Sequence, residues 1–137
     1  MAARILLDTH VWLWFNGAPE RLSEEPQRAL VDPESALFLS AASTWGDRDQ
    51  ARRRPPRAAG VAGAVHPLAP GRNNVRPLAI QHSHTLAAAS LPLHHRDPFD
   101  RMLIAQAQQE GLTLATSDAR RRAYEAPIMW SRADGLP

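Results

Sequence analysis

Three short apolar runs, each followed by an acid or a hydroxyl residue, constrain the fold of this chain most strongly. The runs are Ile5-Leu6-Leu7 before Asp8, Ala36-Leu37-Phe38-Leu39 before Ser40, and Leu112-Thr113-Leu114-Ala115-Thr116 before Ser117-Asp118. Runs of this length and composition are typical of buried strands. Helical patterns separate them, so the order of elements predicts an α/β fold with a mostly parallel central sheet.

The intervening segments carry the signals of helix ends. Asp97-Pro98 places an acid at a cap and proline in the first turn, and Gly111 is a typical stop, which predicts a helix from there to about Glu110. Further helices are predicted over 11–15, 24–31, 41–45, 81–90 and 117–123, and further strands over 75–80 and 128–130.

Length and composition bound the class of protein. A chain of 137 residues is expected to form one domain over residues 1–137. The absence of cysteine excludes a disulfide scaffold, a thiol nucleophile and a thiolate zinc site. No apolar run reaches the roughly 20 residues that cross a bilayer, and residues 1–8 are typical of a strand opening rather than a signal peptide. We therefore expect a cytoplasmic protein with no membrane partner.

Charge is distributed unevenly along the chain. All 16 basic residues are arginine, and residues 46–72 hold six of them against two aspartates. The same stretch contains four prolines and four glycines and shows no helical or strand period. It is predicted to be an irregular, basic segment inside an otherwise mildly acidic domain.

Three aspartates stand where such a fold places its ligands. Asp8 and Asp118 follow predicted strands, and Asp100 lies in the first turn of a predicted helix. Ligands bind outside the carboxyl ends of the strands in open parallel sheets, so these acids could meet at one edge. Clustered carboxylates suit Mg²⁺ or Mn²⁺. The alternatives are that Asp97 and Asp118 only cap helices, and that Asp8 is a turn residue or a phosphate acceptor.

Four segments together resemble the PIN-domain family, and in particular the VapC-type toxins of bacterial type II toxin–antitoxin systems. They are LLDTHVWLW (6–14), LSAASTW (39–45), HRDPFDRMLIAQA (95–107) and LATSD (114–118). The resemblance covers about residues 4–45 and 73–130. It implies a PIN-like α/β/α sandwich.

The resemblance also implies an activity and partners. Members are metal-dependent endoribonucleases that hydrolyse RNA phosphodiester bonds, pair with a VapB-type antitoxin and form homodimers. By position, Asp8 matches the first metal-binding acid, Asp100 the third and Asp118 the fourth, and Thr116 matches the hydroxyl residue that accompanies the last acid. We expect Mg²⁺ or Mn²⁺ as cofactor. In addition, Arg101 and Arg120, next to these acids, are candidate RNA contacts, with a carboxylate pair or a solvated helix face as alternatives.

The chain departs from the family pattern at the second acid. The family places Glu directly after the tryptophan of the second motif, whereas Trp45 is followed here by Gly46, and Asp47 is one residue late. One synonymous back-translation of residues 46–51, read one base later, encodes Glu-Ile-Ala-Ile-Lys, the family's motif. We therefore hypothesise a frameshifted segment over about 46–72; a natural basic loop that grips RNA phosphates is the alternative.

Two other functions stay open at this point. Without the second acid, activity could be impaired, and the chain could be a catalytically dead PIN-fold remnant that only binds an antitoxin. A receiver-like domain phosphorylated on Asp8 is a weaker alternative, because receivers carry their phosphate acceptor on a middle strand.

Overall fold

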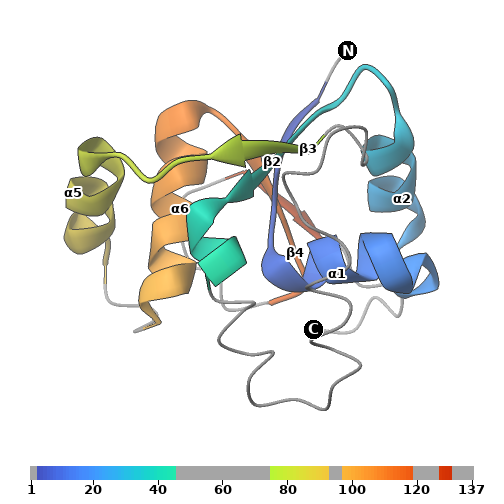
Figure 1. Cartoon of the computed structure of the whole chain (residues 1–137), viewed down its shortest axis with the longest axis horizontal. Coiled ribbons are helices and arrows are strands. Elements are labelled where there is room, and N and C mark those ends of the chain that lie inside the picture. Colours follow the sequence, from blue (N-terminus) through green and yellow to red (C-terminus); the bar gives the residue numbers. More distant parts are fainter. Residues whose placement is uncertain (1–2, 46–74, 93–96, 119–126, 131–137) are drawn as a thin grey trace.

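A five-stranded parallel sheet forms the centre of the molecule (Figure 1). The computed structural model describes residues 3–45, 75–92, 97–118 and 127–130. The strands are β1 (Arg4–Leu7), β2 (Ala36–Ser40), β3 (Val75–Leu78), β4 (Thr113–Thr116) and β5 (Ile128–Trp130). Their order is β3-β2-β1-β4-β5, and every neighbouring pair is parallel. The predicted α/β fold is confirmed.

Helices cover both faces of this sheet. They are α1 (Thr9–Gly17), α2 (Glu24–Val31), α5 (His82–Ser90) and α6 (Pro98–Glu110), with a 3-10 turn, η1 (Pro19–Arg21), and a helical segment at 41–45. α1 begins two residues earlier than predicted, directly after Asp8. None of the described helices is long and apolar enough to cross a membrane. The irregular segment predicted at 46–72 and most of the helix predicted at 117–123 lie outside the described residues.

Strand β1 shows why the sheet needs two helical layers. Ile5 and Leu7 belong to one core cluster and Leu6, between them, to another, because successive side chains point to opposite faces. The first cluster includes residues of α1 and α2, and the second includes residues of α6. Figure 1 shows α1 and α2 on one side of the sheet and α5 and α6 on the other. β1 is therefore buried on both faces.

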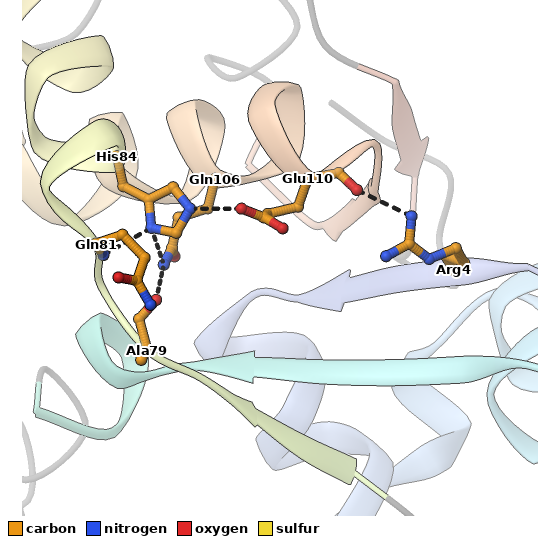
Figure 2. Close-up of polar contacts among 6 residues, drawn as sticks. All are labelled: Arg4, Ala79, Gln81, His84, Gln106 and Glu110. Atoms are coloured by element: carbon orange, nitrogen blue, oxygen red, sulfur yellow. Dashed lines mark hydrogen bonds and ion pairs between the residues drawn. The ribbon is translucent and has the colours of Figure 1, made fainter.

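A buried polar cluster, here called the His84 network, joins α5 to α6 (Figure 2). His84 is 1% exposed, and its Nε2 lies 2.9 Å from Oε2 of Glu110. Its Nδ1 accepts a hydrogen bond from the backbone N–H of Gln81 (2.9 Å), as half of a capping box at the start of α5. Nε2 must then carry the ring proton and donate to Glu110. Gln106 of α6 is also fully buried, and its side-chain amide donates to the carbonyl of Ala79 (3.3 Å).

Candidate active site

Asp8 is fixed at the point where β1 becomes α1. Its backbone N–H donates to the carbonyl of Ala115 on β4 (3.0 Å), which extends the sheet by one residue. Its own carbonyl accepts from the N–H of Trp12 (2.9 Å) and so starts the helix. The side chain is only 3% exposed. The carboxylate is thus held by the backbone on both sides at the carboxyl edge of the sheet.

The hydroxyl of Thr116 links two of the predicted acids. Thr116 Oγ1 donates to Asp8 Oδ2 at 2.9 Å and accepts the backbone N–H of Asp118 at 3.1 Å. Thr116 is fully buried at the end of β4, beside Asp8. One hydroxyl therefore orients the first acid and fixes the chain that carries the last, although Asp8 and Asp118 are 110 positions apart in sequence.

Asp100 reaches the same edge from α6. At the far end of this helix, the guanidinium of Arg4 donates to the carbonyl of Glu110 (2.9 Å), which places the C-terminus of α6 beside the start of β1. Measured from this contact, Asp100 lies about 15 Å away toward the start of α6, and Asp8 lies about 13 Å away toward the end of β1. Both end at the same level, as Figure 1 shows for the elements that carry them. Asp100 is 5% exposed.

The first turn of α6 is built as its sequence predicts. Asp97 caps the helix, because its Oδ1 accepts the N–H of Phe99 (2.9 Å), and Pro98 is the first helical residue. Gly111, with a φ of 66°, ends the helix in the left-handed conformation that glycine adopts without strain. The capping role considered for Asp97 is confirmed, which leaves Asp100 as the buried acid of this turn.

The tryptophan of the second motif also lies near Asp100. Trp45 lies at the end of the helical segment that follows β2. The centroid of its ring is 5.1 Å from the ring centroid of Phe99, the residue before Asp100. That segment starts at Ser40, whose Oγ accepts the N–H of Ala42 (3.0 Å). The residues after Trp45, where the family has its second acid, lie outside the described part of the chain.

The two candidate RNA contacts are placed differently. The guanidinium of Arg101 donates to three backbone carbonyls at the end of α5, a role that the sequence alone did not predict. No short pattern in the sequence signals this contact, because its acceptors lie 9–13 residues earlier in the chain. Arg120 lies outside the described residues.

The donor set fits a hard divalent cation in chemistry but is not a complete metal site. The acids at this edge offer carboxylate oxygens, the ligands that Mg²⁺ and Mn²⁺ prefer. Burial of the Asp8 and Asp100 carboxylates is costly, and a nearby cation reduces that cost. Within the described residues, however, no three His, Asp or Glu side chains are grouped closely enough to hold a metal ion. A metal ion could therefore bind here only with a further ligand or after a small movement of the acids.

Comparisons with known proteins agree with this architecture. The family model of the PIN domain matches residues 5–126. Ribonuclease VapC22 of Mycobacterium tuberculosis is 31% identical over 126 residues, which cover 90% of this chain and 93% of that protein.

Solved structures share the fold at low sequence identity. VapBC2 of Rickettsia felis, bound to a DNA fragment of its promoter, matches with a TM-score of 0.70 at 11% identity, over 93% of this chain and 98% of that one. Mycobacterium tuberculosis VapC20, a toxin that cleaves the sarcin-ricin loop, matches with a TM-score of 0.65 at 19% identity, over 89% of this chain and 95% of that one. The expected resemblance is confirmed: the chain belongs to the PIN-domain family, among its VapC-type members.

Proposed function

We propose that this protein is a metal-dependent endoribonuclease toxin that hydrolyses RNA phosphodiester bonds at the carboxyl edge of its sheet. The observation that carries the proposal is the hydroxyl of Thr116, which holds the Asp8 carboxylate and the backbone of Asp118 together at this edge. Membership of the VapC-type branch, with a ribonuclease as a relative over 90% of the chain, supports the same activity.

Asp8, Asp100 and Asp118 are the proposed ligands of Mg²⁺ or Mn²⁺. When bound, the ion would polarise a phosphoryl oxygen and lower the pKa of a water molecule that attacks phosphorus. The protein's own contribution is position. Thr116 orients Asp8 by donating to Oδ2, and the start of α1 fixes the Asp8 backbone. The first turn of α6 presents Asp100 from the facing helical layer.

A VapB-type antitoxin is the proposed protein partner. Several proteins of the same fold have been solved as VapBC assemblies, including those of Rickettsia felis and Salmonella typhimurium. We extend the partnership to this chain because it belongs to the VapC-type branch. Co-expression with the small gene next to its own should suppress toxicity in growing cells.

An RNA cleavage assay on the full chain tests the enzymatic proposal. The protein should cleave RNA with Mg²⁺ or Mn²⁺ and lose activity with a chelator. Asp100→Asn should abolish cleavage, because it removes a proposed ligand. Asp97→Asn is the matched control: it lies in the same turn, and asparagine caps helices as well as aspartate.

Two results would reject the proposal. Cleavage that persists in Asp100→Asn would show that this acid is not part of the machinery. A folded wild-type chain that binds its antitoxin but cleaves no RNA would identify the protein as the inactive remnant considered above.

A further inference from the structure

The guanidinium of Arg101 forms hydrogen bonds with backbone carbonyls at the C-terminal end of α5. Its two terminal nitrogens donate to the carbonyls of Ala88 (2.7 Å), Leu91 (2.9 Å) and Pro92 (3.0 Å). The last carbonyls of a helix lack partners within the helix and form the negative end of its dipole. A planar, permanently charged fork suits such a set of acceptors better than an ammonium group does.

These contacts tie two elements together beside the acid site. Arg101 belongs to the first turn of α6, and its acceptors belong to the last turn of α5 and the residues after it. The residue on the other side of Asp100, Phe99, makes a second tertiary contact, with Trp45. Asp100 therefore lies between two contacts that hold the first turn of α6 to different parts of the molecule.

Such contacts matter because the ends of helices fray. The cap at Asp97 stabilises the turn locally, but it does not fix the turn relative to the rest of the domain. A small displacement of a catalytic group lowers the rate strongly, and side chains that support a metal ligand affect it by about 10- to 100-fold.

We propose that Arg101 is a positioning residue of the acid site: its guanidinium fastens the end of α5 to the first turn of α6 and thereby holds the Asp100 carboxylate in place. The inference rests on the proposed function of Asp100. It differs from the RNA contact expected from sequence, because the guanidinium is directed at carbonyls of the protein itself.

The test compares the full-length wild type with Arg101→Gln, Arg101→Lys and the control Arg28→Gln. Arg28 is an exposed arginine of α2 that pairs with Glu24. Amide hydrogen exchange of the metal-free proteins reports on residues 87–91 and 99–104. We expect exchange in both segments to become about 10-fold faster in Arg101→Gln, and to stay unchanged in Arg28→Gln.

RNA cleavage and RNA binding provide the second readout. At saturating RNA, Arg101→Gln should cleave about 10- to 100-fold more slowly, and Arg101→Lys should not restore the full rate. The salt dependence of RNA binding should not change, whereas loss of a phosphate contact would reduce its logarithmic slope by about one.

The outcomes separate this inference from the proposed function. Unchanged exchange in both segments, a reduced salt slope, or full rescue by lysine would each overturn the positioning role. A wild type that cleaves no RNA would overturn the proposed function instead, and hydrogen exchange would still decide whether Arg101 anchors the turn.

Discussion

Two polar clusters that each include residues of α6 differ in composition. The His84 network combines an imidazole, an amide and a carboxylate. Its donors meet acceptors, although Oε1 of Gln106 has no partner among the described residues. The acid edge, defined here as Asp8, Asp100, Asp118 and Thr116, consists of three acids and one hydroxyl. That hydroxyl donates to the Asp8 carboxylate and accepts the backbone N–H of Asp118. Complementary groups stabilise a fold, whereas like charges brought together oppose folding unless a cation binds. We therefore expect the first cluster to contribute to stability and the second to serve the proposed chemistry.

The largest expected effect is on activity at the acid edge. Asp8→Asn keeps an acceptor for Thr116 but removes a charged proposed ligand. We expect RNA cleavage to fall by about 10³-fold, equivalent to about 4 kcal/mol of transition-state stabilisation. The free energy of unfolding, measured by urea denaturation without metal, should not decrease, because a buried charge is lost. A marked loss of stability with normal cleavage would reverse the assignment of the two clusters.

The His84 network should show the opposite behaviour. His84→Ala leaves Glu110 and the N–H of Gln81 without their imidazole partner and opens a cavity. We expect the free energy of unfolding to fall by about 2–4 kcal/mol, with cleavage per folded molecule unchanged. The control is His82→Ala, an exposed position on the same helix, which should change stability by less than about 0.5 kcal/mol. Equal effects of the two substitutions would contradict a structural role for the network.

Substitution of Thr116 is expected to affect both activity and stability. Thr116→Val removes the donor to Asp8 and the acceptor for Asp118 at nearly constant volume. We expect cleavage to fall by about 10- to 100-fold, and the free energy of unfolding to fall by about 1–3 kcal/mol. Thr116→Ser keeps the hydroxyl and should retain most of the activity. If serine and valine behave alike, the hydroxyl has no positioning role.

The smallest effect is expected inside the His84 network. The Oε1 atom of Gln106 is buried and has no hydrogen-bond partner among the described residues. Gln106→Leu removes this unsatisfied acceptor, whose burial is unfavourable. It also removes the long contacts of Nε2 with the Ala79 carbonyl (3.3 Å) and His84 Nδ1 (3.4 Å), which are favourable, so we expect the two effects to offset each other. The free energy of unfolding, from the same urea titration, should change by less than about 1 kcal/mol. A loss above about 2 kcal/mol would mean that the amide is essential to the network.

The same contrast explains what the sequence could predict. Asp8 and Asp118 follow apolar runs, and parallel strands bring such residues to one edge whatever their distance along the chain. The ends of α6 followed from Asp97, Pro98 and Gly111 by local rules. The position of these acids and the ends of α6 both follow from short local patterns, and such patterns can be read from a single sequence.

The His84 network and the Arg101 anchor could not be predicted in this way. Both depend on how α5 packs against α6, and no periodicity in residues 82–90 specifies which side chain of α6 faces His84. Arg101 follows Asp100, so proximity in sequence suggested a phosphate or carboxylate partner. The actual acceptors, at Ala88, Leu91 and Pro92, lie 9–13 residues earlier and become neighbours only in the folded chain.

The proposed metal site is tested most directly by Mn²⁺ binding to the full chain, measured by electron paramagnetic resonance. If Asp8, Asp100 and Asp118 share a divalent cation, the wild type binds Mn²⁺, each Asp→Asn variant at these positions binds at least about 10-fold more weakly, and Asp97→Asn binds like the wild type. Wild-type affinity in the Asp100→Asn variant, or no binding by the folded wild type, would show that these three acids do not share a divalent cation.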